Sequence, residues 1–242
     1  MIMGALTATI LLCWAWIVPM ARDMYGEMDG PSAWMMPHHW DFPHLVLLFA
    51  MWVVMMIGMM LPSAAPALLL YAGVVRKSRA RQQVRTQVYA FASGYLLVWT
   101  AFSLLATILQ RLLSDWMLLS PMMESRAWLG GVLLVVAGAY QLTPFKRSCL
   151  ETCRSPVNFI VGHWQRGVTG ALRLGIAHGT YCLGCCWALM LLLFVGGVMN
   201  LWWIAALTIF VLLEKVAPLG AQGGRLSGLL MLILGLFYLV RN

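Results

Sequence analysis

Long apolar runs separated by short charged segments are the feature that most constrains the fold of this chain. An apolar run of about 20 residues is long enough to cross a bilayer as a helix, and a helix satisfies its backbone hydrogen bonds internally. We therefore predict an all-α, polytopic helical membrane protein with about seven transmembrane helices, in a single integral membrane domain over residues 1–242. The predicted spans are 5–20, 45–75, 88–113, 128–142, 168–198, 201–219 and 226–240.

Composition and charge agree with this class. The chain is 62% hydrophobic and only 10% charged, unlike an ordinary soluble domain. The formal net charge of +8 does not indicate a nucleic-acid partner, because the basic residues cluster between apolar runs, as the positive-inside rule predicts. With the amino terminus inside, the basic segments Arg76–Arg85 and Thr143–Gly167 lie in the cytoplasm, and the acidic loop Arg22–His44 lies outside.

Two of the predicted spans contain residues that disturb a helix. Pro62 and Pro66 interrupt the second span, and proline removes a backbone hydrogen bond and kinks a helix. Gly184 lies inside the fifth span. We expect the second and fifth spans to be kinked or broken, and paired interrupted helices can mark a transport site.

The fifth span contains the segment His178-Gly-Thr-Tyr-Cys182-Leu-Gly-Cys185-Cys186-Trp187. On a helix, His178, Cys182 and Cys185 fall at i, i+4 and i+7, and Cys186 follows at i+8, so all four lean toward one stripe. Imidazole and thiolate are ligands that suit copper(I) or zinc. Buried cysteines also act as small hydrophobic residues, but three with an aligned histidine favour a metal or redox site.

A methionine stripe in the second span is a second candidate for soft-metal binding. Met55 and Met59 are one helical turn apart, and Met60 lies beside them. Thioethers either coordinate copper(I) or simply pack flexibly. A helix rises about 1.5 Å per residue, so this stripe and the fifth-span cysteines overlap near the middle of a hydrocarbon core about 30 Å thick.

Cys149 and Cys153 are spaced i, i+4 in the second basic segment, on a helical turn that Pro156 is expected to end. They are either two unrelated cysteines or a pair that receives or releases a soft metal. Because they precede the fifth span, we expect them to form a separate site at the cytoplasmic mouth, away from the midplane cysteines.

Charged residues near the end of the sixth span have two interpretations. We expect Lys215 to be interfacial, because a lysine at a helix end can snorkel. Glu214 is either the countercharge of its neighbour or a ligand and proton acceptor. The acidic loop either captures copper or packs on the membrane surface through its methionines and histidines, which are Met24, Met28, Met35, Met36, His38, His39 and His44.

These segments resemble a bacterial family described only as predicted metal-binding integral membrane proteins, a domain of unknown function. The resemblance covers most of the chain, and its most specific element is Cys182-x-Gly-Cys185-Cys186-Trp187. It implies metal binding in the bacterial cytoplasmic (inner) membrane, and it supplies neither a reaction nor a metal. The matching segments are Trp52–Ser63, Gly94–Trp99, Ala139–Pro144, Lys146–Pro156, His178–Trp187, Met199–Leu201 and Glu214–Lys215.

We therefore expect a metal-binding protein that transports copper(I), or delivers it to a membrane or metallochaperone partner, with zinc as the alternative metal. One alternative function is a membrane thiol-disulfide oxidoreductase that uses Cys149/Cys153 and Cys182/Cys185 as exchanging pairs. Another is a scaffold or assembly subunit without metal. No catalytic residue is predicted, and the candidate metal ligands are Cys182, Cys185, Cys186, His178, Met55, Met59, Met60, Cys149, Cys153 and Glu214.

Overall fold

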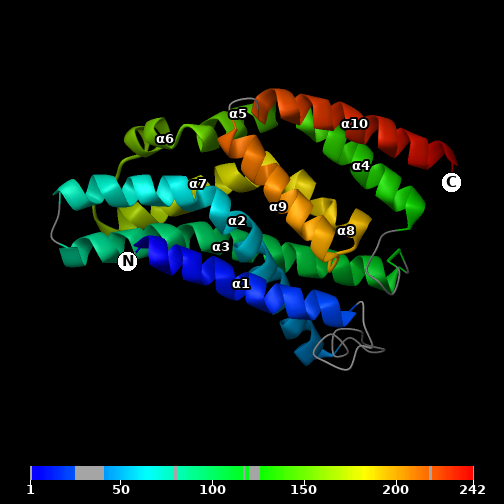
Figure 1. Ribbon diagram of the computed structural model, residues 1–242, viewed down its shortest axis with the longest axis horizontal. Coiled ribbons are helices and arrows are strands. Elements are labelled where there is room, and N and C mark those ends of the chain that lie inside the picture. The colour runs from blue at the N-terminus through cyan, green and yellow to red at the C-terminus, as the bar shows by residue number, and fades with distance from the viewer. Residues whose placement is uncertain are drawn as a thin grey trace.

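The computed structural model describes residues 2–24, 41–78, 81–116, 118–119, 126–217 and 220–241. All regular secondary structure in these ranges is helical, which confirms the prediction of an all-α protein (Figure 1). The helices are α1 (Ile2–Met24), α2 (Phe42–Ser78), α3 (Arg81–Asp115), α4 (Ala127–Gln141), α5 (Pro144–Arg154), α6 (Pro156–Gly162), α7 (Gly167–Leu191), α8 (Leu193–Gly196), α9 (Leu201–Val216) and α10 (Gly220–Arg241).

Within the described ranges, five helical segments are long and apolar enough to cross a membrane. They are Ile2–Asp23, Phe42–Arg76, Gln83–Asp115, Gly167–Gly196 and Gln222–Arg241. Helices α4 and α5, which are bent by 65° relative to each other, make a sixth if the pair is one crossing. The runs expected to span at 128–142 and 201–219 form α4 and α9, whose 15 and 16 residues fall short of the ~20 needed for an upright crossing.

Helix α2 runs between the two connections that the sequence assigns to opposite sides of a membrane. Its last turn lies at one end of the long axis of the molecule, beside the start of α3 (Figure 1). Its first turn lies toward the other end, on the side where α1 ends. The side of the membrane on which each end lies stays a prediction.

The two disturbed spans behave differently from each other. Helix α2 stays helical through Pro62 and Pro66, and Figure 1 shows its two halves running in different directions, so it is kinked and not broken. The fifth span is interrupted as expected, but at Leu192, between α7 and α8, and not near Gly184, through which α7 continues. An isolated glycine costs a helix only about 1 kcal/mol, and here the small residue serves packing: a Cβ at Gly184 would lie 2.9 Å from the Cys149 sulfur.

Glycines bring α4 and α10 into backbone contact. A Cβ on Gly138 would lie 2.7 Å from the carbonyl oxygen of Gly228, and a Cβ on Gly235 would lie 2.8 Å from that of Gly131. Any larger side chain at these positions would push the helices apart. The close contact holds α10 alongside α4, and the two helices run side by side in Figure 1.

Candidate metal centre

Helix α7 carries three cysteines into the middle of the protein. It packs tightly on α3, where a Cβ on Gly175 would overlap the backbone of Phe91. This contact fixes the face of α7 that turns toward α2 and α9. Cys182, Cys185 and Cys186 are each only 1% exposed.

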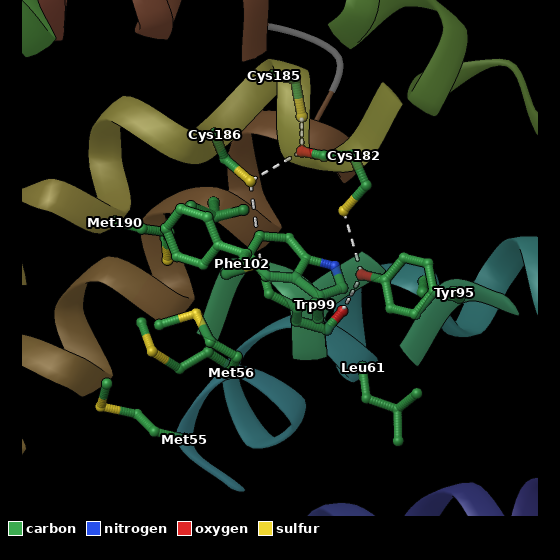
Figure 2. Packing of buried hydrophobic residues seen from close by; sticks show 14 of the residues in the cluster. Met55, Met56, Leu61, Tyr95, Trp99, Phe102, Cys182, Cys185, Cys186 and Met190 are labelled. Carbon is green, nitrogen blue, oxygen red and sulfur yellow. Dashed lines mark hydrogen bonds between the residues drawn. The ribbon is translucent and has the colours of Figure 1, made fainter. Parts of the chain in front are cut away.

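Cys182 is contacted by two polar side chains from other helices. Lys215 of α9 donates a hydrogen bond from Nζ to Cys182 Sγ at 2.9 Å, and the Tyr95 hydroxyl lies 3.1 Å from the same sulfur (Figure 2). Lys215 also donates to Ser63 Oγ at 3.1 Å, and the Tyr95 hydroxyl donates to the Met60 carbonyl at 3.1 Å. The thiolate is the form of cysteine that binds metals, and a buried ammonium group supplies the charge that compensates it.

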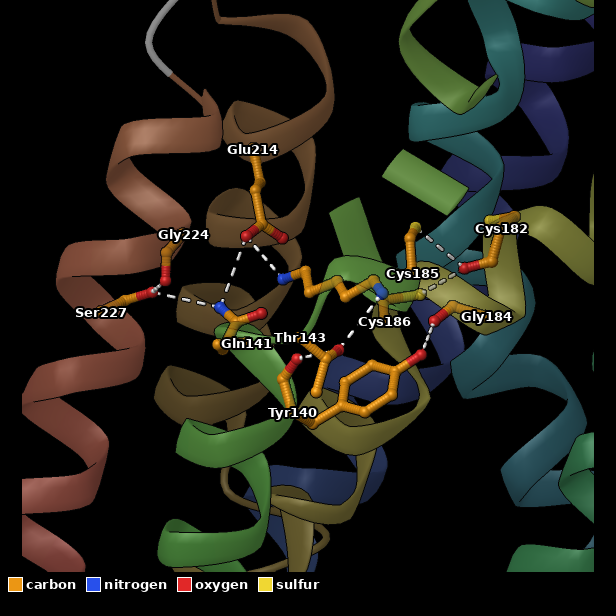
Figure 3. A network of polar contacts seen from close by, with 11 residues as sticks. Tyr140, Gln141, Thr143, Cys182, Gly184, Cys185, Cys186, Glu214, Gly224 and Ser227 are labelled. Carbon is orange, nitrogen blue, oxygen red and sulfur yellow. Dashed lines mark hydrogen bonds and ion pairs between the residues drawn. The ribbon is translucent and has the colours of Figure 1, made fainter. Parts of the chain in front are cut away.

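Cys185 and Cys186 turn back toward their own helix. Both thiols donate hydrogen bonds to the Cys182 carbonyl oxygen, at 3.1 and 2.9 Å (Figure 3). Cys186 Sγ also lies 4.0 Å from Met60 Sδ. In the described part of the chain, no three His, Cys, Asp or Glu side chains stand ready to hold an ion. Metal coordination therefore requires these thiols to rotate away from the carbonyl.

The predicted methionine ligands occupy different places relative to these cysteines. Met60 places its thioether against Cys186. Met55 and Met59, each 1% exposed, belong to the same apolar core. In Figure 2 the sulfur of Met55 lies well away from the sulfurs of Cys185 and Cys186. The geometry therefore favours Met60 as the thioether that joins the cysteines.

His178 lies among aromatic rings. Its imidazole is 3% exposed and packs against Phe91, Tyr95 and Phe159, with ring centroids 5.9, 5.8 and 5.3 Å away. Its Nδ1 atom has no hydrogen-bond partner among the described residues. Buried polar atoms are usually hydrogen-bonded, so this nitrogen is free to coordinate a metal one turn before Cys182. The role of His178 as a metal ligand stays a prediction.

Helix α5 packs against the part of α7 that carries the cysteines, which corrects the prediction that Cys149 and Cys153 lie away from them in a separate site. Thr143 Oγ1 accepts a hydrogen bond from the Lys146 backbone, and Pro144 starts the helix after the 65° bend. The bend directs α5 back onto α7, where Cys149 packs against Gly184 and Cys153 packs against the buried cluster that contains Cys185. The depth estimate from the sequence failed here because it placed the segment after α4 beyond the end of α7, whereas the bend lays α5 alongside α7.

Glu214 and Lys215 are both buried, and they have different partners. Glu214 Oε1 accepts hydrogen bonds from Lys146 Nζ at 2.6 Å and from Gln141 Nε2 at 3.3 Å (Figure 3). Glu214 is therefore the countercharge of Lys146 and not of its neighbour. The interfacial position expected for Lys215 is wrong, because a partner on α7 draws its ammonium group inward instead of toward a membrane surface.

Four contacting residues had no role assigned from the sequence: Ser63, Tyr95, Gln141 and Lys146. All four lie within segments that carry the family resemblance, but their partners come from helices distant in sequence. The sequence did contain an indication that Lys215 belongs to the site, because a lysine inside an apolar run is by default a candidate functional residue. The acidic loop expected to capture metal falls on residues 25–40, which lie outside the described residues.

Comparison with known proteins agrees with a role in copper handling. The family model PpoB2, described as a copper chaperone, matches residues 49–238. This range includes α3 to α9 and all the candidate ligands. No curated protein and no solved structure matches the chain.

Proposed function

We propose that this chain, which belongs to the PpoB2 copper chaperone family, is an integral membrane protein that binds copper(I) on buried sulfurs and delivers it to a membrane partner. The observation that carries the proposal is the cluster of three buried cysteines beside the Met60 thioether and the Lys215 ammonium group. Thiolate and thioether are the ligands that select copper(I).

Surface composition supports insertion in a bilayer. The outward face of α10 is apolar, with Leu226, Ile233 and Phe237 66%, 58% and 55% exposed, and Leu12 of α1 is 71% exposed. Water-soluble proteins rarely leave such extended apolar faces uncovered. We propose seven crossings, made by α1, α2, α3, α4, α7, α9 and α10, with the bilayer thinned around the short helices α4 and α9. The amino terminus lies on the cytoplasmic side of the inner membrane.

Charge balance favours copper(I) over zinc. Two thiolates around one copper(I) ion carry a net charge of −1, and the buried Lys215 ammonium group cancels it. Two thiolates around zinc are neutral, which leaves the ammonium charge uncompensated, and an uncompensated buried charge is costly. Zinc restores the balance only with a third thiolate, and it then needs a fourth ligand in a tetrahedron.

Metal analysis of purified protein tests the proposal. The parent protein, reconstituted anaerobically with copper(I) and washed, should retain about one ion per chain. The double variant Cys182→Ser/Cys185→Ser should lose nearly all of it while still inserting, because serine is tolerated in membrane helices. Cys13→Ser, in the buried face of α1, is the matched control and should keep the parent's content. A double variant that retains the parent's copper would rule out this site.

The second candidate function, a thiol-disulfide oxidoreductase, is favoured by one contact. Cys153 packs against the buried cluster that contains Cys185, and these two thiols are a pair different from the two expected from the sequence. An oxidoreductase would form this disulfide in metal-free protein and reopen it with a reductant. Mass spectrometry of alkylated, copper-free protein separates the two functions, because a copper(I) carrier keeps both thiols reduced.

A further inference from the structure

Sulfur-bearing side chains follow one another from helix α5 to helix α2. Cys153 packs against the buried cluster that contains Cys185, and the thiols of Cys185 and Cys186 donate to one shared acceptor, the Cys182 carbonyl oxygen, at 3.1 and 2.9 Å. Cys186 Sγ lies 4.0 Å from Met60 Sδ. Each step joins neighbouring side chains, so a soft ion can stay bound to sulfur along the whole series.

Exposure gives this series an outer and an inner end. Cys185, Cys186 and Met60 are each at most 1% exposed, whereas Cys153 is only half-buried. Cys153 stands in the last turn of α5, one residue before the helix ends at Arg154. It is therefore the member of the series that a copper carrier or chelator outside the protein can reach.

We infer that Cys153 is the port through which copper(I) passes between an external thiol carrier and the buried cysteines. The inference rests on the proposed function and adds a route to it. The ion moves by ligand exchange: a bond from copper to Cys185 forms as the bond to Cys153 breaks. The proton of the incoming thiol passes to the departing thiolate. Copper stays in the +1 state throughout, so no oxidant or reductant is needed.

Cys149 provides a matched control on the same helix. It lies one turn before Cys153, and its sulfur packs against Gly184, only 2.9 Å from where a Cβ on that glycine would stand. It is 6% exposed. Cys149 thus fills a packing gap between α5 and α7, and its replacement should leave the route intact.

The experiment compares copper content with the rate of copper exchange. Parent protein, Cys153→Ser and Cys149→Ser are loaded with copper(I) in detergent and mixed with excess bathocuproine disulfonate, a water-soluble copper(I) chelator. All three should hold the same copper at the start. Cys153→Ser should release it at least about tenfold more slowly, because the outer sulfur ligand is gone. Cys149→Ser should release it at the parent's rate.

A second measurement avoids mutation altogether. Brief treatment of the loaded parent protein with iodoacetamide should modify Cys153 first, leave the bound copper in place and slow its release as much as Cys153→Ser does. The proposal that Cys153 is the port fails if Cys153→Ser releases copper as fast as the parent, or if Cys149→Ser slows release as much as Cys153→Ser does. It also fails if Cys153→Ser loses its copper at equilibrium. A parent protein that binds no copper overturns the proposed function itself, so the two failures are distinguishable.

Discussion

Lys215 of α9 and Cys182 of α7 meet inside the protein, with the lysine nitrogen 2.9 Å from the cysteine sulfur. Both side chains are buried, at 7% and 1% exposure. Water therefore screens neither group, and each depends on the other for its stability. Removing one partner of a buried charged contact leaves the other uncompensated.

Replacing this lysine should weaken copper binding. We expect Lys215→Met to raise the dissociation constant for copper(I) about 10- to 100-fold, since hydrogen bonds to charged groups contribute about 1.5–3 kcal/mol and 1.4 kcal/mol is a factor of ten. Competition with a copper(I) chelator of known affinity measures the change. Lys215→Arg, which keeps the charge, should lose much less. Equal affinities for the parent and Lys215→Met would show that the ammonium group has no part in binding.

The ion pair between Lys146 and Glu214 should contribute to stability and not to copper binding. Both side chains are 2% exposed, so Glu214→Gln leaves the Lys146 charge buried without its carboxylate. We expect a loss of about 3–5 kcal/mol in the free energy of unfolding, seen as a lower Tm in detergent. The double variant Lys146→Met/Glu214→Leu should recover most of it. Copper loss from variants that stay folded would instead make Glu214 a ligand.

Contact between α4 and α10 should depend on the absence of a side chain at Gly138. A Cβ there would lie 2.7 Å from the Gly228 carbonyl and 2.9 Å from the Leu232 backbone nitrogen. Gly138→Ala should therefore destabilise the protein by about 1–3 kcal/mol. Gly73→Ala is the control, because its Cβ would meet nothing within 4 Å, and it should be neutral or stabilising by up to about 1 kcal/mol. Thermal unfolding compares the two, and equal effects would contradict tight packing at Gly138.

Among the methionines, Met60 should matter most for copper. Met60→Leu conserves volume and removes the sulfur that lies 4.0 Å from Cys186. We expect copper(I) affinity to fall about tenfold, because a thioether is a weaker ligand than a thiolate. Met55→Leu should have little effect, since the Met55 sulfur lies away from the cysteines. The reverse order of effects would shift the site toward the first half of α2.

The proposed orientation predicts opposite labelling at the two ends of α2. In a parent lacking Cys153, single cysteines replace Asp41 and Arg76, which are both exposed. A membrane-impermeant maleimide added to intact cells should label the cysteine at position 41 and not the one at position 76. Labelling at position 76 alone would invert the topology.

Helix positions were predictable from this sequence because each reflects a local pattern. Apolar runs mark the helices. The predicted spans at 168–198 and 201–219 are separated by a turn, after which the Asn200 side chain accepts a hydrogen bond from the Trp203 backbone at the start of α9.

Residues of the site were predictable only where one helix supplies them. Cys182, Cys185 and Cys186 share a face by helical spacing alone. Their contact with Cys153 depends on the bend between α4 and α5, and their contact with Lys215 depends on how α9 lies against α7. Neither leaves a periodic signal in the sequence, since both result from packing between segments far apart in the chain.

Glu214 and Lys215 are consecutive residues, so their side chains leave α9 about 100° apart. Glu214 reaches toward Lys146 of α5, and Lys215 reaches toward Cys182 of α7. The rotation of α9 about its own axis therefore sets the position of both side chains. If α9 turned about its own axis, the carboxylate would leave Lys146 and the ammonium group would leave Cys182 in the same movement. The ion pair and the Lys215–Cys182 contact therefore both hold α9 at the same rotation about its axis.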